Sequence, residues 1–202
     1  MFAIVEAAGW PIWFLMIASV IAVALIVERL FFLRNKNIAP AGLLDLVLKE
    51  FKQQGVTDTA LSRMAEASPL GRIFAAGLRN VKSPPEVMKN AIEEAGRAVA
   101  HELERFLTTL GTIASISPLL GLFGTIVGMI EIFGAQTAVG NNPAILAHGI
   151  SVALYNTAFG LIVAVPSMIF YRHFRAKVHS LVFEMERQAI KLVEIVHGER
   201  AP

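Results

Sequence analysis

The sequence predicts an all-α membrane protein with three transmembrane helices, two of them very long and extending into the cytoplasm as a helical bundle. The first observation is the stretch Phe106–Tyr171, which contains no Lys or Arg and a single acid, Glu131. The second is a separate apolar run at 10–33. About 20 apolar helical residues cross a hydrocarbon core about 30 Å thick. The run at 10–33 therefore provides one span, and the longer stretch, folded at a polar turn, provides two.

Basic residues set the expected orientation of these spans. Every Lys and Arg lies in Arg29–Arg105 or in Arg172–Arg200, and such residues concentrate on the cytoplasmic side of a membrane. We therefore expect the N-terminus outside and the C-terminus inside. The expected segments are an outer segment (1–9), a first span (10–33), a cytoplasmic helical loop (34–105), a second span (106–133), an outer turn (134–148), a third span (149–171) and a cytoplasmic helical tail (172–202).

A signal peptide is the competing interpretation of the first apolar run. The run is too long for the apolar part of such a peptide, and its basic residues, Arg29 and Arg34, stand at its C-terminal end instead of preceding it. Trp10 and Trp13 stand at its outer end, where interfacial aromatic residues are common. A membrane anchor that faces lipid is therefore the favoured interpretation.

The composition argues against several classes of function. The chain has no cysteine and five scattered His, which argues against disulfides, thiol nucleophiles and zinc sites. It contains no phosphate-binding loop, no nucleophile beside a base and no basic patch of the kind that binds nucleic acid. We therefore expect no catalytic residues, no metal, no cofactor and no nucleic-acid partner, and we do not expect an enzyme.

Helix start signals predict the first of two long helices. Ser83 is a plausible N-cap, Pro84 suits the first helical position and Glu86 completes a capping box. No strong breaker follows before the membrane, so we expect one helix over 84–133. Pro118 should bend it inside the bilayer.

The second long helix is expected over 143–197, with a bend near Pro166. Asn142 and Pro143 provide its start signal, a cap followed by proline in the first turn. Its tail keeps an apolar stripe at Val178, Leu181, Val182, Met185, Ile190 and Val193. The residues at 37–82 are amphipathic and interrupted, which predicts short helices that pack on one another or on the long ones.

Small and polar residues form stripes at spacings of three and four on the second and third spans. Such stripes let helix backbones approach closely in lipid. We assign Gly121, Gly124, Gly128, Gly160, Pro118 and Pro166 to helix packing.

Hydroxyl-bearing residues lie at matched depths if the hairpin folds about Asn141. Thr125 is then level with Thr157, and Glu131 with Ser151. A Thr hydroxyl can bond its own helix backbone; alternatively, several copies around an axis would line a narrow, weakly polar lumen. We favour the lumen, because one hairpin cannot bury two small-residue faces alone. The candidate pathway residues are Thr125, Thr157, Glu131, Ser151 and Asn156.

Glu131 is the only acid within the second and third spans. Intramembrane charges are costly and often functional, but Glu131 stands near the outer end of its span, where the cost falls. It is either a residue of the outer lip or part of a proton or cation relay.

Two motifs resemble a known family. S-P-L-L-G-L-F-G-T-I-V-G-M at Ser117–Met129 and G-I-S-V-A-L-Y-N-T-A-F-G-L-I-V-A-V-P at Gly149–Pro166 are similar to the second and third spans of the MotA/TolQ/ExbB proton-channel family. The resemblance covers nearly the whole chain. The three-span layout is that of the ExbB and TolQ branches, whereas flagellar stators of the family have an additional span.

The resemblance implies a homo-pentamer in the bacterial inner membrane, with a periplasmic N-terminus and a cytoplasmic C-terminus. The ring would surround an ExbD-like single-span partner whose membrane Asp carries the proton, with Thr125 and Thr157 facing the lumen. Proton flow would energise a TonB-like protein and, through it, outer-membrane transport. A TolQ-like role in the Tol-Pal system and a non-conducting scaffold are the alternatives.

One position departs from the family pattern. Many relatives have Glu where this chain has Val152, which puts an intrinsic carboxylate relay in doubt. Glu131 stands where some relatives have an uncharged polar residue, so it either compensates or is incidental.

Overall fold

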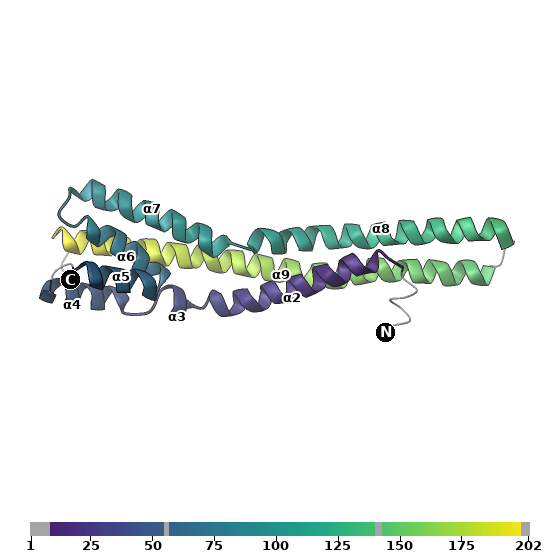
Figure 1. Ribbon diagram of the computed structural model, residues 1–202, viewed down its shortest axis with the longest axis horizontal. Helices are drawn as coiled ribbons and strands as arrows, with labels where there is room; N and C mark the ends of the chain where they lie inside the picture. Colours follow the sequence, from purple (N-terminus) through teal and green to yellow (C-terminus); the bar gives the residue numbers. More distant parts are fainter. Residues whose placement is uncertain (1–8, 55–56, 140–142, 199–202) are drawn as a thin grey trace. The chain divides into compact units, whose positions relative to one another are not determined.

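A computed structural model describes residues 9–54, 57–139 and 143–198. Within these ranges every regular element is an α-helix, and three helical stretches are long and apolar enough to cross a membrane. This confirms the predicted fold class. The helices are α2 (Ile12–Phe32), α3 (Asn35–Ile38), α4 (Leu43–Gln54), α5 (Asp58–Ala67), α6 (Pro69–Arg79), α7 (Pro85–Glu104), α8 (Leu107–Val139) and α9 (Pro143–Val196) (Figure 1).

The chain divides into two compact units. The first, called here the membrane unit, comprises Met1–Glu28 and Phe106–His173. The second, called the bundle unit, comprises Arg29–Arg105 and Phe174–Pro202. Because α2 and α9 each contribute residues to both units, the chain passes between the units within these two helices and at the junction of α7 with α8.

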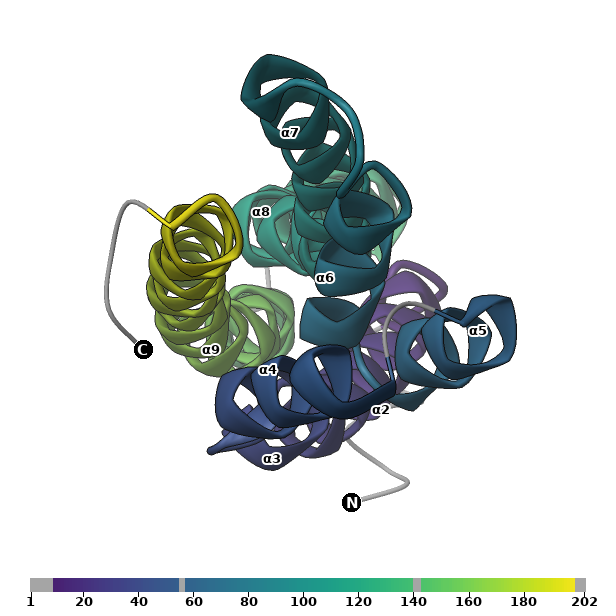
Figure 2. The same cartoon turned by 90° about the vertical axis from the view of Figure 1, so that its left-hand side faces the viewer.

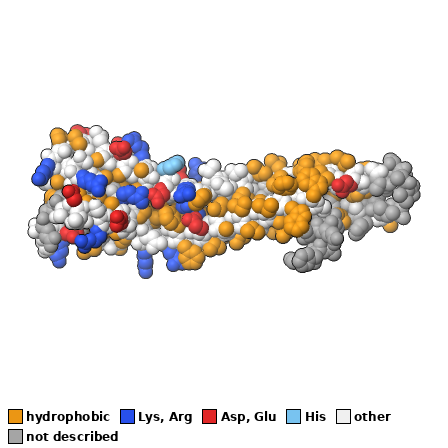
Figure 3. Space-filling model, in the orientation of Figure 1, with side chains coloured by type: hydrophobic (Ala, Val, Ile, Leu, Met, Phe, Trp, Pro, Cys, Tyr) orange, Lys and Arg blue, Asp and Glu red, His pale blue; other side chains and the backbone are white. Residues whose placement is uncertain are grey.

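The membrane unit has a large apolar surface. Trp13 on α2, Ile130 on α8 and Ile162 on α9 are 59%, 67% and 66% exposed. Hydrophobic side chains, shown in orange in Figure 3, cover much of the visible surface of these helices. Water solvates such a surface poorly, whereas a bilayer solvates it well. The outward faces of the three helices are therefore suited to lipid.

The core of the bundle unit includes α6, which contacts both α5 and α7 (Figure 2). Ser68 caps α6, because its hydroxyl oxygen accepts a hydrogen bond of 3.0 Å from the Gly71 N–H. Phe74 of α6 and Met88 of α7 are completely buried. Figure 3 shows Lys, Arg, Asp and Glu side chains gathered on the surface of this unit. The bundle unit thus has an ordinary apolar core and a charged exterior.

The single helix predicted over 84–133 is wrong, because the structure interrupts it. Helix α7 ends at Glu104 and α8 begins at Leu107. Between them, Arg105 has the angles of a polyproline-like residue, φ −51° and ψ 139°, and Phe106 has a φ of 65°, in the left-handed region. The Arg105 N–H donates to the Glu102 carbonyl three residues earlier, at 3.3 Å, and the Phe106 carbonyl accepts the first bond of α8, from the Leu110 N–H at 3.0 Å. Two helices therefore replace the expected one.

The start of α7 also differs from the predicted capping box. The helix begins at Pro85, with Pro84 as N-cap and no side-chain cap hydrogen bond. A residue that precedes proline is disfavoured in the helical region, so Pro84 stays outside the helix. The N–H of Ser83 donates instead to the Asn80 carbonyl at 3.0 Å, in the turn after α6.

The outer turn is shorter than predicted. Helix α8 continues to Val139, so the residues from Gly134 to Val139 are helical instead of belonging to the turn. No proline follows Pro118 before the end of α8, and polar side chains are compatible with the last turns of a helix. Most of the predicted outer segment and the predicted cap Asn142 lie outside the described residues.

The second long helix is confirmed to within one residue at its C-terminal end, since α9 spans Pro143–Val196. Its predicted apolar stripe is buried at Val178, Leu181 and Met185. Ile190 differs, being 52% exposed.

Candidate functional site

Glycines bring the backbones of α8 and α9 into contact in the membrane unit. A Cβ added at Gly121 would lie 2.7 Å from the carbonyl oxygen of Asn156, and one added at Gly160 would lie 2.6 Å from the carbonyl oxygen of Ser117. A side chain cannot occupy such positions unless the backbone moves. This is the close approach that small residues permit between membrane helices.

Two further glycines of the predicted stripe border the same contact. A Cβ added at Gly124 would lie 2.7 Å from Cγ of Asn156, and one added at Gly128 would lie 3.3 Å from Cβ of Ala153. Together these contacts set an antiparallel register of α8 against α9. The register agrees with the hairpin expected from the sequence.

Asn156 lies inside this helix contact. It is 1% exposed, and its side chain packs directly against Gly124. The sequence analysis placed Asn156 in the small and polar stripe of the third span and among the candidate pathway residues. In the single chain it is a contact residue between the two helices.

Each long helix pairs a proline with a buried serine in this unit. Pro118 lies inside α8 beside Ser117, and Pro166 lies inside α9 beside Ser167. Both serines are 1% exposed, and each donates its hydroxyl to the carbonyl four residues earlier at 2.7 Å. Proline lacks the N–H that the helix ladder needs, and serine bonds of this kind often accompany a bend. Bends at Pro118 and Pro166 stay predictions, and the buried serine bonds are compatible with them.

Thr125 and Thr157 lie at the edge of the α8–α9 contact and on the same side of the hairpin. Each follows a residue of the contact, Gly124 and Asn156 respectively, and each is half-buried. One residue step turns a side chain by about 100° around a helix. Because the two helices are antiparallel, that step turns both side chains toward the same side. The two hydroxyl-bearing residues are thus neighbours on one face.

The Thr125 hydroxyl donates to the Leu122 carbonyl of its own helix at 2.6 Å. In the single chain it is therefore satisfied locally, which is one of the two roles that the sequence left open. Thr125 also borders an open hollow of about 430 Å³, whose other lining residues are Ile126, Met129, Ile130 and Phe133. Its side chain is the one polar group in that apolar lining.

Glu131 and Ser151 are both exposed, on α8 and α9 respectively. The Ser151 hydroxyl donates to the Ala147 carbonyl at 3.0 Å. Gly149 contacts Ile132, which puts Glu131 and Ser151 at similar levels of the hairpin. An exposed carboxylate at this level is compatible with both roles considered for Glu131.

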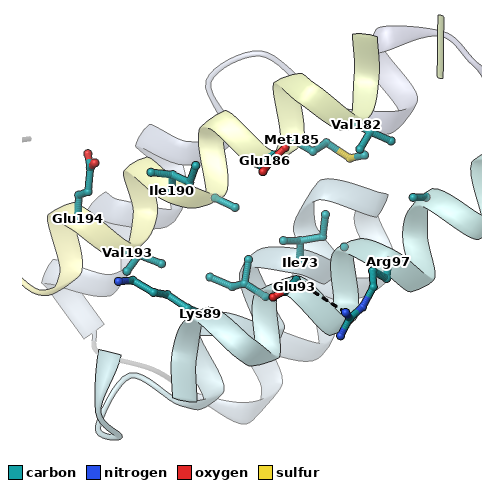
Figure 4. A pocket seen from close by; sticks show the side chains of 14 residues that line it. Ile73, Lys89, Glu93, Arg97, Val182, Met185, Glu186, Ile190, Val193 and Glu194 are labelled. Carbon is teal, nitrogen blue, oxygen red and sulfur yellow. Dashed lines mark hydrogen bonds and ion pairs between the residues drawn. The ribbon is translucent and has the colours of Figure 1, made fainter. Parts of the chain in front are cut away.

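Sequence reasoning missed a groove in the bundle unit. Its volume is about 500 Å³, and it lies between α7 and α9 with an apolar floor (Figure 4). Lys89 and Arg97 line the α7 wall, and Glu186 lines the α9 wall. A Cβ added at Gly96 would have no neighbour within 4 Å. Small residues at Gly96 and Ala100 were the only sequence signal for this opening.

The arrangement offers hydroxyls more readily than acid–base groups. Among the described residues, no three His, Asp or Glu side chains are grouped so that they could hold a metal ion. Two neighbouring threonines can accept and donate hydrogen bonds, but a hydroxyl passes a proton on only beside a group that ionises. The site on the hairpin face is thus suited to act together with an ionisable group from elsewhere.

Known proteins resemble this chain over most of its length. Residues 65–187 match the MotA/TolQ/ExbB proton channel family. A biopolymer transport protein of Synechocystis, described as ExbB-like, is 33% identical over 184 residues, which cover 89% of this chain and 86% of that protein. A biopolymer transport protein of the ExbB type from Vibrio cholerae is 32% identical, with 79% of this chain and 72% of that protein covered. The Tol-Pal system protein TolQ of Pseudomonas aeruginosa is also 32% identical, with 71% and 69% covered.

Proposed function

Because this chain belongs to the MotA/TolQ/ExbB proton channel family, we propose that it is the ring-forming subunit of a proton-driven motor that energises TonB-dependent outer-membrane transport. The observation that carries the proposal is the pair Thr125 and Thr157. They are neighbours on one face of the α8–α9 hairpin and half-buried at its edge. Members of this family are proton channel subunits of the inner membrane, and the family is not one of enzymes.

A ring explains how a face with two hydroxyls is used inside a bilayer. One hairpin leaves Thr125 at the rim of an apolar hollow, where a polar group gains little from lipid. Repeating the hairpin around a symmetry axis turns the same face toward a shared lumen. A homo-pentamer is the arrangement we propose, with Thr125 and Thr157 of every copy lining the passage.

The partner in the lumen must supply the ionisable group. Threonine hydroxyls do not ionise at physiological pH, so they orient a proton donor or acceptor without replacing it. We propose a single-span, ExbD-like protein with an Asp in its membrane helix, which in turn acts on a TonB-like protein. Glu131, exposed at another level of α8, would then serve the entrance of the passage, and Ser151 would lie beside that entrance.

The test uses a bacterial strain that lacks its own ExbB, in which this chain is expressed together with its single-span partner. We expect the native chain to restore TonB-dependent uptake of an iron complex. Thr157→Val keeps the shape of the side chain and removes its hydroxyl, so uptake should fall by about tenfold or more while the assembly stays intact on size-exclusion chromatography.

The matched control is Thr112→Val. Thr112 is exposed on α8 and donates to the Thr108 carbonyl at 2.9 Å, so uptake should not change. Unchanged uptake in Thr157→Val would show that the Thr157 hydroxyl takes no part in the pathway. Restored detergent resistance in a strain that lacks TolQ, without restored uptake, would assign the chain to the Tol-Pal role instead. If the chain restored neither uptake nor detergent resistance, the result would favour the non-conducting scaffold.

A further inference from the structure

Arg29 is a buried cation near the end of α2. It is 3% exposed, and its guanidinium carbon lies 4.9 Å from the centre of the Phe32 ring. Its Nη1 donates a hydrogen bond of 3.2 Å to the carbonyl oxygen of Leu103. Burying a guanidinium is costly unless it is well bonded. The burial of the Arg29 guanidinium therefore points to a structural role for this side chain.

The Leu103 carbonyl accepts this bond because the helix is interrupted just beyond it. In an uninterrupted helix the N–H of Leu107 would bond to Leu103. The backbone angles of Arg105 and Phe106 turn the chain out of that ladder. The guanidinium thus supplies the donor that the interruption removes, as a helix C-terminus often requires from a basic side chain.

We infer that Arg29 is a positioning residue of the ion pathway, because it holds the end of α7 and so sets the direction and rotation with which α8 begins. The inference rests on the proposed function, since α8 bears Thr125. Arg29 begins the first segment of the bundle unit and Arg105 ends it. The bond to Leu103 therefore ties together the two ends of that segment, at the place where the chain leaves the unit.

The variants separate the hydrogen bond from the charge. Arg29→Met keeps an unbranched side chain, two bonds shorter, and removes its donors. Arg29→Gln restores a donor without the charge, and Arg29→Lys keeps the charge and one donor group. The control is Arg34→Met. Arg34 lies 4.9 Å from the centre of the Phe31 ring, in the same stacking geometry, but it is exposed.

Spin labels across the interruption report its geometry in the full chain. The sequence has no cysteine, so Glu93→Cys on α7 and Leu119→Cys on α8 give one defined pair of labels. Labelled subunits are diluted with unlabelled ones, and the distance distribution is measured by pulsed electron paramagnetic resonance. A hydrogen bond to a charged group shifts a two-state population by about tenfold or more.

We expect Arg29→Met to raise the population outside the native distance peak by about that factor. Arg29→Lys, which keeps the charge and most of the reach, should restore most of the native peak. Arg29→Gln, whose amide is neutral and two bonds shorter, should give an intermediate distribution, and Arg34→Met should give the native one. Distributions that are alike in all variants would overturn the inference, as would a change of equal size in Arg34→Met. If Arg29→Met does not assemble, Arg29→Lys and Arg29→Gln still decide the outcome.

Proton flux into liposomes decides whether the geometry matters for the pathway. Flux through the complex with its partner should fall in Arg29→Met and recover in Arg29→Lys, in step with the distance distributions. A changed distribution with unchanged flux would overturn the positioning role. A native complex without any proton flux would count against the proposed function itself, while the distance measurement would still test the bond between Arg29 and Leu103.

Discussion

Phe106 has a backbone conformation that bulky residues rarely adopt. Its φ is 65°, and the left-handed region costs an L residue about 1–2 kcal/mol because the Cβ crowds the following carbonyl. The residue is 37% exposed, so burial of its ring offsets only part of this cost. Phe106 lies where the chain leaves the bundle unit, between the end of α7 and the start of α8.

This strain predicts an unusual response to glycine. Phe106→Gly should leave the midpoint of thermal unfolding unchanged or raise it, whereas Phe106→Val, which is β-branched, should lower stability by about 1–2 kcal/mol relative to the glycine variant. Circular dichroism of the detergent-solubilised chain measures both.

The control for this pair is Phe183→Gly. Phe183 is 68% exposed within the regular helix α9, where glycine costs about 1 kcal/mol. Equal destabilisation by glycine at the two positions would show that the Phe106 backbone is not strained.

The helices follow from the sequence wherever their signals are local. Pro143 opens α9 as expected, and the apolar stripe of its tail is buried. The junction of α7 and α8 lacks such a signal. Buried residues continue through it at spacings of three and four, at Val99, Leu103, Leu107 and Leu110. The left-handed residue, Phe106, is also not a glycine, so the usual sequence signal for that conformation is absent.

The candidate site was predictable in part for the same reason. Thr125 and Thr157 follow from hairpin register alone, which two antiparallel spans and a short turn determine. Asn156 required the packing direction, because a stripe of small residues does not reveal which of its members faces the partner helix. The sequence showed Arg29 only as a charge at the end of a span. The Leu103 carbonyl can accept its hydrogen bond only because the helix is interrupted after Leu103.

Close packing of α8 on α9 leads to a test on a single methyl group. Gly160→Ala would put a Cβ 2.6 Å from the Ser117 carbonyl oxygen and 3.2 Å from Cα of Gly121. Both neighbours are backbone atoms, so the helices must separate, and we expect a loss of about 1–3 kcal/mol. Chemical unfolding of the solubilised chain measures it.

The same substitution at Gly96 is the control. A Cβ there meets nothing within 4 Å, and replacing glycine by alanine in a helix gains about 0.5–1 kcal/mol. The two variants should therefore move stability in opposite directions. A stabilising Gly160→Ala would contradict the tight contact between α8 and α9.

The two units differ in chemistry in a way that predicts the orientation of the protein in the membrane. Charged side chains gather on the bundle unit, whereas the described part of the membrane unit has apolar outward faces on three helices. Moving the bundle unit across a bilayer would require the transfer of most of the basic residues of the chain, and loops rich in Lys and Arg stay on the cytoplasmic side. We therefore expect the C-terminal end of α8 and the N-terminal end of α9 to lie outside.

This orientation can be tested with single cysteines in the otherwise cysteine-free chain. Gly134→Cys adds a side chain with nothing within 4 Å, near the C-terminal end of α8. Lys82→Cys lies at an exposed position between α6 and α7. A membrane-impermeant maleimide should label Gly134→Cys in spheroplasts, where the outer face of the inner membrane is accessible. It should label Lys82→Cys only after the inner membrane is permeabilised, because the positive loop cannot cross. Labelling of Lys82→Cys in intact spheroplasts would reverse the orientation and would put the bundle unit on the side where no cytoplasmic partner can reach it.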